Sequence, residues 1–217
     1  MSIRARSTLL LDLDGTLVDP AQGIIGCYRH ALLALDAPAP EDDDLRWVIG
    51  PPMRESFARL LSKRDSIDAA VQLYRSRYAE WGLYQAARYS GVRTALEAHR
   101  RRGTRLILCT AKPHIFARRV VDYFALSPFL DALYGPELDG RYDDKGDLID
   151  HILQTEQLDP ADVCMVGDRR HDILAASRNG IPTVGVLWGY GSRDELNDAG
   201  AAILIEKPSE LLPPTAD

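Results

Sequence analysis

The sequence predicts an α/β protein with a doubly wound (Rossmann-like) parallel sheet and a small all-helical domain inserted after the first strand. Short apolar runs alternate with amphipathic helical patterns along most of the 217 residues, which is typical of a parallel sheet with helices on both faces. Residues 20–88 interrupt this alternation, because only helical patterns occur there. The expected domains are therefore an α/β core (1–19 and 89–217) and a helical insertion (20–88).

The first expected strand is the apolar run Leu9–Leu11, which suits a strand buried on both faces of a parallel sheet. Similar short runs predict further strands at 105–110, 133–135, 163–166, 183–187 and 202–205. Between them, apolar residues at helical spacing predict helices at 92–101, 115–124, 147–157 and 172–178. The last residues, 213–217, are expected to form a loose tail.

The insertion is expected to contain three helices separated by polar or Pro-containing segments. A polar loop is expected at 37–44, and Gly50-Pro51-Pro52 marks a clear break. The aromatic residues Tyr74, Tyr78 and Trp81 share one face of the last helix and are expected to pack in its core. The predicted helices cover 22–34, 53–61 and 66–84.

Composition excludes several classes of function. A net charge of −6 argues against a general nucleic-acid binder, and no apolar run approaches the length of a membrane span. Met1–Arg6 is polar and carries no signal-peptide pattern, so we expect a soluble cytoplasmic protein, either a monomer or a homodimer. Of the 3 cysteines, Cys109 and Cys164 lie in apolar runs and are expected to be reduced core residues.

Two carboxylates close the first strand and point to the chemistry. Residues two apart in an extended chain share a face, so Asp12 and Asp14 would repel each other unless a cation lay between them. Gly15 permits a sharp turn directly afterwards, and Thr16 adds a hydroxyl. The pattern favours a Mg2+-assisted site for an anionic substrate. The alternative is an ordinary turn after a strand, since Asp and Gly are common turn residues.

The other strand ends supply further polar groups. In a doubly wound sheet the carboxyl ends of the strands share the edge at which ligands bind. Thr110 ends the second expected core strand, and Gly167-Asp168 ends a later one, with Asp172 four residues further on. Lys145 precedes the helix that leads into that later strand, and it competes with Lys112 for the role of phosphate ligand. We expect these groups to gather at one edge.

These residues resemble the four motifs of the haloacid dehalogenase superfamily of phosphohydrolases. The motifs are present as residues 12–16, Thr110, Lys145, and Gly167-Asp168 with Asp172. The helical insertion is similar to the C1-type cap of that superfamily. Residues 50–57 and the segment Thr110-Ala111-Lys112-Pro113 are similar to its phosphoglycolate phosphatase-like branch.

The resemblance implies roles for single residues. Asp12 would be the nucleophile, and Asp14 would protonate the leaving group and then activate water. Mg2+ would be held by the Asp12 carboxylate, the Asp14 carbonyl and Asp168, while Asp172 would hold a metal-bound water or orient Lys145. Substrate contacts would come from Gly15, Thr16, Thr110, Ala111 and Lys145. Arg54 of the insertion could reach a substrate anion, although a surface position suits it equally well.

The expected function is that of a Mg2+-dependent phosphomonoesterase. It would hydrolyse a small phosphorylated metabolite through an aspartyl-phosphate intermediate, as phosphoglycolate phosphatase-like enzymes do. A 5'-nucleotidase and a sugar phosphomutase of the same superfamily remain alternatives. A non-catalytic phosphate-binding regulatory module is a further alternative, but loss of Asp12 or Asp14 would be expected in such a module, and both are present.

Overall fold

The computed structural model describes residues 6–213, and the chain divides into two compact units. The core unit comprises Met1–Asp19 and Arg88–Asp217, and the helical unit comprises Pro20–Ala87. The expectations for the two ends of the chain, a polar start over 1–6 and a tail over 213–217, fall almost entirely outside the described residues.

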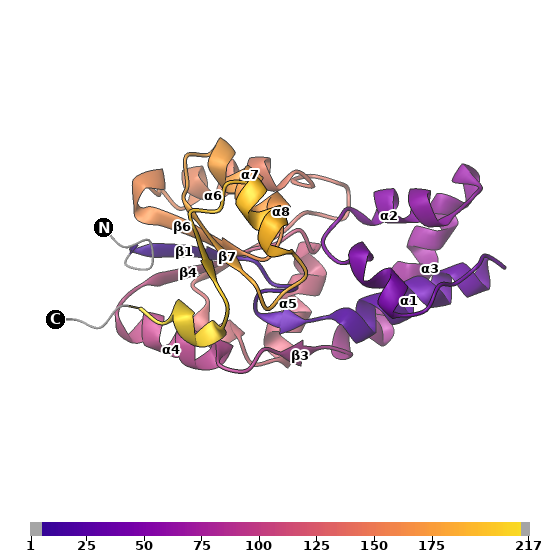
Figure 1. The fold of residues 1–217 in the computed structure, drawn as a ribbon, viewed down its shortest axis with the longest axis horizontal. Helices are drawn as coiled ribbons and strands as arrows, with labels where there is room; N and C mark the ends of the chain where they lie inside the picture. The colour runs from indigo at the N-terminus through magenta and orange to yellow at the C-terminus, as the bar shows by residue number, and fades with distance from the viewer. Residues whose placement is uncertain (1–5, 214–217) are drawn as a thin grey trace. The chain divides into compact units, whose positions relative to one another are not determined.

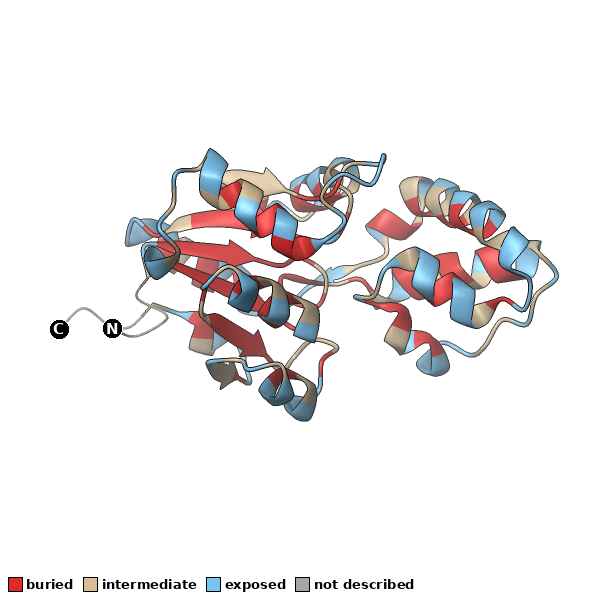
Figure 2. Cartoon of the chain, turned by 90° about the horizontal axis from the view of Figure 1, so that it is seen from above, coloured by how far each residue is buried: buried red, intermediate tan, exposed pale blue. Residues whose placement is uncertain are grey.

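The core unit is built on a sheet of 6 parallel strands in the order β5-β4-β1-β6-β7-β8. β1 lies in the interior of the sheet, with Leu10 level with Ile107 on one side and with Met165 on the other. Figure 2 shows that the central strands are buried along their length. The predicted α/β fold with a parallel sheet is therefore confirmed. The strands are β1 (Thr8–Leu11), β4 (Arg105–Cys109), β5 (Ala132–Tyr134), β6 (Val163–Gly167), β7 (Thr183–Val186) and β8 (Ile203–Ile205).

Helices cover both faces of this sheet. α4 (Val92–Arg101) and α5 (His114–Tyr123) lie on one face. The opposite face carries α6 (Lys145–Thr155), α7 (Arg170–Arg178) and α8 (Arg193–Asp198), as Figure 1 shows. Because the strand order runs outward from β1 in both directions, the order reverses beside β1, where doubly wound sheets bind their ligands.

The starts of α6 and α7, which follow the carboxyl ends of β5 and β6, differ from the expected ones. α6 and α7 each begin two residues before the predicted starts at 147 and 172. Their first residues are polar or glycine and carry no apolar periodicity, so the pattern could not reveal them. For α6 the local signal is instead a cap, since the Asp144 side chain accepts a hydrogen bond from the Asp147 N–H. α8 was not predicted at all, because it has 6 residues and buries only Leu196.

The helical unit contains three α-helices and three short 3-10 helices. They are α1 (Ala21–Ala34), η2 (Asp43–Val48), α2 (Met53–Leu60), η3 (Arg64–Ser66), α3 (Ile67–Glu80) and η4 (Gly82–Tyr84). Aromatic rings form the centre of this unit: the ring centroids of Tyr28 and Phe57 are 4.6 Å apart, and Tyr74 stacks on Tyr78 at 5.6 Å.

Two predicted segments of the helical unit need correction. The helix predicted over 66–84 runs only from Ile67 to Glu80, because Trp81 leaves helical geometry with a φ of −130°. Gly82 then packs so closely on α1 that a Cβ there would lie 2.5 Å from the Cys27 sulfur. The loop predicted over 37–44 gives way to η2 at Asp43, whose two acidic first-turn residues suit a helix N-terminus.

The chain leaves and re-enters the core unit through two short strands. β2 (Val18–Asp19) and β3 (Ala87–Arg88) pair with each other in a separate 2-stranded sheet. Directly beside them, the Tyr89 N–H donates to the Leu17 carbonyl at 3.2 Å. The two crossings of the chain are therefore adjacent.

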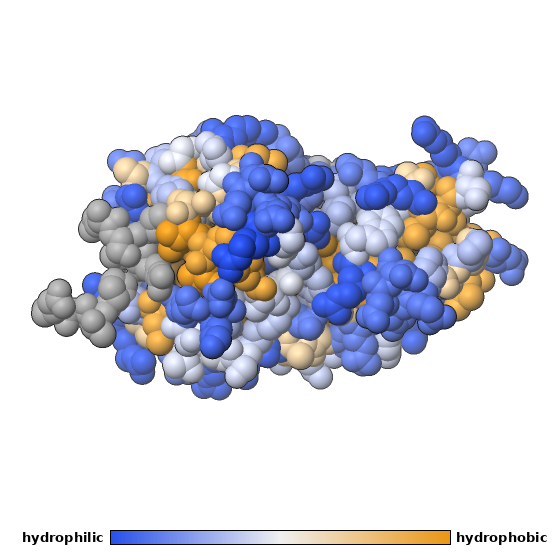
Figure 3. Space-filling view, in the orientation of Figure 1, coloured by the Kyte–Doolittle hydropathy of each residue, from blue (hydrophilic) through white to orange (hydrophobic). Residues whose placement is uncertain are grey.

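The three cysteines are buried free thiols, as predicted for Cys109 and Cys164. Burial raises the pKa of Cys109 to about 12, so this thiol stays protonated at neutral pH. Figure 3 shows hydrophilic residues over much of the visible face, with exposed hydrophobic residues in scattered areas. Among residues 6–213, no helix has both the length and the apolar character that crossing a membrane requires.

A buried histidine predicts acid sensitivity of the core unit. His99 of α4 is fully buried, and its Nε2 lies 2.8 Å from the Leu211 carbonyl, which can only accept a hydrogen bond. Burial lowers the pKa of His99 below its ordinary value of 6.5. The unfolded chain therefore binds a proton at a higher pH than the folded protein does. We expect the free energy of unfolding to fall as the pH drops below about 6.5.

Urea denaturation at pH 8 and at pH 5.5 tests this expectation. His99→Gln keeps a side-chain donor but does not titrate, so its loss of stability between the two pH values should be smaller. His30→Gln, at an exposed histidine of α1, is the control. An equal loss in His99→Gln and wild type would contradict the expectation.

Candidate active site

A tight turn directly after β1 presents the first two candidate carboxylates. The Val18 N–H donates to the Leu13 carbonyl at 3.0 Å, and the Gly15 N–H donates to the Val18 carbonyl at 2.8 Å. Gly15 has a φ of 85°, which a side chain would strain. A Cβ there would also lie 2.1 Å from a carboxylate oxygen of Asp168. The turn therefore requires glycine at this position and brings the ends of β1 and β6 into contact.

Lys145 joins two of the candidate carboxylates. As the first residue of α6 it is buried, and its Nζ lies 2.8 Å from Asp12 Oδ1 and also donates to Asp172 Oδ1. Burial alone would lower the pKa of Lys145, but the Asp12 and Asp172 carboxylates more than offset this and raise it. Lys145 is therefore a cation at neutral pH, fixed against Asp12.

Lys112 contacts the other early carboxylate. Its Nζ lies 2.7 Å from Asp14 Oδ2, and both side chains are largely buried. The Lys112 N–H donates to Thr110 Oγ1 at 3.2 Å, so the threonine hydroxyl also helps to shape the segment after β4. The two carboxylates of the turn after β1 therefore have different partners: Lys145 contacts Asp12, and Lys112 contacts Asp14.

Asp168 and Asp172 bring two further carboxylates to the same place. One ligand oxygen from each of Asp12, Asp168 and Asp172 lies within 4.8 Å of the others. Asp172 is engaged within the chain, since one oxygen accepts from Lys145 and the other from the Arg169 N–H at 3.0 Å. Asp168 Oδ2 accepts from a loop amide at 2.7 Å, whereas its buried Oδ1 has no hydrogen-bond partner in the described chain.

The charge of this cluster is unbalanced. Four carboxylates (Asp12, Asp14, Asp168 and Asp172) face two ammonium groups. Burial raises the pKa of Asp12 and raises that of Asp168 well above its ordinary value, and neighbouring carboxylates add to both shifts. A divalent cation would supply the missing charge and would satisfy the orphaned Asp168 oxygen. Oxygen ligands of this type suit Mg2+, so the residues present fit that ion.

The other residues predicted to contact substrate differ in burial and in their hydrogen-bond partners. The N–H groups of Gly15 and Thr16 donate within the turn after β1, whereas Ala111 is exposed beyond the end of β4. The Thr16 hydroxyl is buried without a hydrogen-bond partner among the described residues. In the helical unit, the exposed Arg54 side chain pairs with Asp68 at 2.6 Å.

Sequence reasoning missed the loop 187–192 after β7. Its Trp188 and Tyr190 side chains contact Thr16 and Asp19 of the segment that follows β1. The loop has no acidic or basic residue, so a search for charged side chains at strand ends passed over it. The available signal was the pair of glycines, Gly189 and Gly191, directly after an apolar strand.

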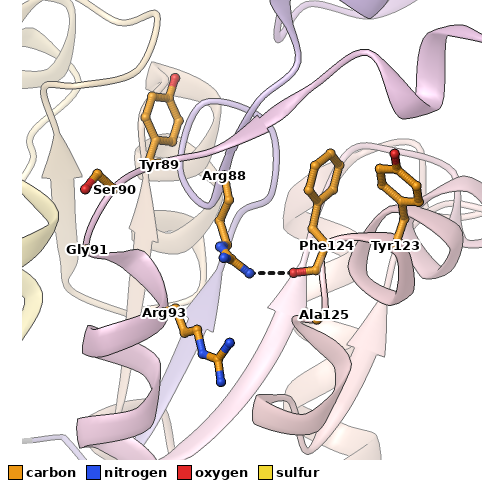
Figure 4. A pocket seen from close by; sticks show the side chains of 8 residues that line it. All are labelled: Arg88, Tyr89, Ser90, Gly91, Arg93, Tyr123, Phe124 and Ala125. Carbon is orange, nitrogen blue, oxygen red and sulfur yellow. Dashed lines mark hydrogen bonds between the residues drawn. The ribbon is translucent and has the colours of Figure 1, made fainter.

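A surface pocket of about 660 Å³ lies elsewhere in the core unit, between the start of α4 and the end of α5. Figure 4 shows the Arg88 side chain inside it, donating to the Phe124 carbonyl at 2.7 Å. No carboxylate lines this pocket, so it is separate from the cluster around Asp12. It is lined by Arg88, Tyr89, Ser90, Gly91, Arg93, Tyr123, Phe124 and Ala125.

Comparison with known proteins shows a family whose members this chain resembles over most of its length. Residues 9–186 match the family model described as haloacid dehalogenase-like hydrolase. A haloacid dehalogenase-like hydrolase of Streptococcus pneumoniae has a solved structure that superposes with a TM-score of 0.90 at 33% identity, covering 97% of this chain and 98% of that one.

Curated relatives carry several activities. A 5'-nucleotidase of Pseudomonas aeruginosa is 41% identical over 189 residues, covering 87% of this chain and 86% of its own. A tyrosine-protein kinase of Mycobacterium tuberculosis is 35% identical and covers 90% of this chain, which spans 67% of the kinase. A phosphoglycolate phosphatase of Caulobacter vibrioides is 29% identical, covering 92% of this chain and 86% of its own.

Proposed function

The chain belongs to the haloacid dehalogenase-like hydrolase family and is a phosphoric monoester hydrolase, and we propose that it hydrolyses small phosphorylated metabolites through an aspartyl-phosphate on Asp12 in a Mg2+-dependent reaction. The observation that carries this proposal is the buried Asp12 carboxylate, held by Lys145 at the switch point of the sheet. A carboxylate fixed in this way can attack phosphorus.

In the proposed first step, Asp12 forms the covalent intermediate. Lys145 binds Oδ1, which leaves Oδ2 to attack the phosphorus atom of the ester. The bond between phosphorus and the ester oxygen breaks as the acyl-phosphate bond forms. Lys145 also offsets the negative charge of the transferring group, and such positioning and charge stabilisation account for most of the rate in phosphoryl transfer.

Asp14 is proposed to move the proton in both steps. Lys112 holds its Oδ2, while its buried Oδ1 makes no hydrogen bond to any described residue and is the atom we assign to proton transfer. Protonated Asp14 gives its proton to the leaving oxygen. The resulting carboxylate then removes a proton from the water that attacks the aspartyl-phosphate, which releases inorganic phosphate and restores Asp12.

Mg2+ is proposed to be held by the Asp12 carboxylate, the Asp14 carbonyl and Asp168 Oδ1, and when bound it would neutralise charge on the phosphoryl group. Asp172 is proposed to orient Lys145, since both of its oxygens are engaged within the chain. The Thr110 hydroxyl accepts a hydrogen bond and can still donate its own proton to a phosphoryl oxygen. We assign the helical unit the role of a cap that selects the leaving group.

Phosphate release from a panel of esters tests this proposal. The panel contains phosphoglycolate, nucleoside 5'-monophosphates and sugar phosphates, each with Mg2+ and with excess EDTA. We expect release with Mg2+, a fall of at least about a hundredfold with EDTA, and recovery when Mg2+ is restored. No release from any ester with Mg2+ would contradict the proposal, and equal release with EDTA would contradict its metal dependence.

Nucleoside 5'-monophosphates are the substrate class that we place first. The relative named 5'-nucleotidase is 41% identical to this chain, against 29% for the phosphoglycolate phosphatase. We therefore expect the highest kcat/KM in the panel for a nucleoside 5'-monophosphate. A higher kcat/KM for phosphoglycolate would contradict this ranking of substrates.

Phosphoryl transfer to a tyrosine side chain is a second candidate. It rests on the 35% identity to a protein named tyrosine-protein kinase. A tyrosyl hydroxyl would then replace water as the acceptor of the phosphoryl group from Asp12. Incubation with radiolabelled ATP and a tyrosine-containing polymer tests it, and label in inorganic phosphate but not in the polymer would exclude this activity.

A further inference from the structure

The loop 187–192 lies unusually close to Asp168. A Cβ at Gly189 would lie 2.4 Å from both the Cβ and the Oδ2 of Asp168, and one at Gly191 would lie 2.0 Å from the Asp168 carbonyl oxygen. Only glycine fits at such distances, because either methyl group would displace the loop or the aspartate. The loop therefore packs directly against the proposed metal ligand.

The loop also binds one of the two carboxylate oxygens of Asp168 and leaves the other without a partner in the described chain. The Tyr190 N–H donates to Oδ2 at 2.7 Å, which fixes the orientation of the carboxylate. Oδ1 is the atom left buried and without a hydrogen-bond partner in the described chain. A shift of the Tyr190 backbone would therefore move or rotate the oxygen that is proposed to bind the metal.

Two side chains of the loop bind it to the segment after β1. Trp188 Nε1–H donates to the Thr16 carbonyl at 3.0 Å, and the Tyr190 hydroxyl donates to Asp19 Oδ1. Thr16 belongs to the turn that carries Asp12, so the loop joins the ends of β1 and β6 from outside the carboxylate cluster. Neither side chain contains a group that ordinarily binds Mg2+.

We propose that Trp188 and Tyr190 are positioning residues that hold the loop 187–192 and thereby set the divalent-metal affinity of Asp168. This inference rests on the metal site of the proposed function. The side chains act through the loop backbone, which orients the carboxylate. Residues that orient metal ligands typically change metal affinity about 10–100-fold when mutated.

Metal binding by the full-length protein tests the inference without reference to turnover. Mn2+ serves as the probe, because its free form is counted by electron paramagnetic resonance. We expect Tyr190→Phe and Trp188→Phe each to raise the dissociation constant for Mn2+ about tenfold. Tyr123→Phe, which removes the hydroxyl of an exposed tyrosine in the same unit, is the matched control and should bind Mn2+ as wild type does.

Activity measured against metal concentration provides an independent readout. In the two loop variants the half-saturating Mg2+ concentration should rise, while kcat at saturating Mg2+ and the KM for the ester stay close to wild type. A purely structural role would instead lower the thermal midpoint of the metal-free protein without changing the dissociation constant for Mn2+.

The outcomes separate this inference from the proposed function. If wild type binds Mn2+ and both loop variants bind it equally well, the inference is wrong and the proposed metal site stands. If wild type binds no Mn2+, the inference and the proposed metal site fail together. If the variants bind more weakly and excess metal restores their activity, the inference is supported.

Discussion

Replacing Asp12 by asparagine is expected to lower kcat by roughly a thousandfold or more, because the amide cannot attack phosphorus and removing a nucleophile costs at least that much in comparable enzymes. Asparagine has nearly the same shape, and its oxygen can still accept the hydrogen bond from Lys145. The fold and the KM for the ester should therefore change little. The measurement is steady-state phosphate release with the preferred ester, at saturating Mg2+.

A matched control separates this effect from a general loss of charge. Asp150→Asn makes the same chemical change at an exposed aspartate of α6, and it should leave kcat within about twofold of wild type, as is usual for surface changes away from a site. If Asp12→Asn retained more than a tenth of the wild-type kcat, Asp12 would not be the nucleophile. A neighbouring carboxylate would then have to be considered.

Replacing Lys145 by methionine is expected to reduce both activity and stability. The change leaves Asp12 and Asp172 buried without their shared cation. Removing one partner from a buried ion pair typically costs about 3–5 kcal/mol, because the remaining charge is stranded in a poor solvent. At pH 8 and without metal, we expect a loss of this order in the free energy of unfolding, together with a fall in kcat of at least about a hundredfold.

The stability loss should depend on pH in a defined direction. Burial already raises the pKa of Asp12 when Lys145 is present, and loss of the Lys145 cation raises it further. The protonated form of Asp12 then favours the folded state. This contribution to the variant's stability is largest at low pH and is lost as the pH rises through the raised pKa of Asp12. The difference between wild type and Lys145→Met in urea denaturation should therefore be smaller at pH 5 than at pH 8.

Lys63→Met is the control for this comparison, because Lys63 is exposed. It should change the free energy of unfolding by no more than about 0.5 kcal/mol at either pH. If Lys145→Met were as stable as wild type at pH 8, the contacts of Lys145 with Asp12 and Asp172 would contribute nothing to folding. The conclusion that the four carboxylates of the cluster need more positive charge than the two lysines supply would then have to be revised.

The sheet was predictable because its strands are continuous apolar runs. β1, β4 and β6 are buried on both faces, so each one appears as an uninterrupted apolar segment. The starts of α6 and α7 were less predictable, because Lys145 and Arg170 begin their helices with polar side chains outside the apolar stripe. Helix ends are set by capping and local contacts, which apolar periodicity does not report.

The carboxylates and lysines of the site were found because their charges are conspicuous at strand ends. Their pairing was harder to foresee: the sequence left Lys112 and Lys145 competing for one role, whereas each contacts a different aspartate in the structure. The loop 187–192 could not be found in this way. Its contacts with Asp168 come from a backbone amide and from glycines. Neither has a charged side chain, so a search for charged residues at strand ends does not find them.

The pairing of β2 with β3 affects which insertions, deletions and exchanges of the helical unit the core unit can tolerate during evolution. The helical unit begins directly after β2 and ends in β3, and paired strands are typically about 5 Å apart. A segment whose ends are adjacent can be lengthened, shortened or exchanged without altering the spacing of the strands that hold Asp12 and Asp168. Recombination at these two crossings would therefore supply new inserts to an unchanged sheet.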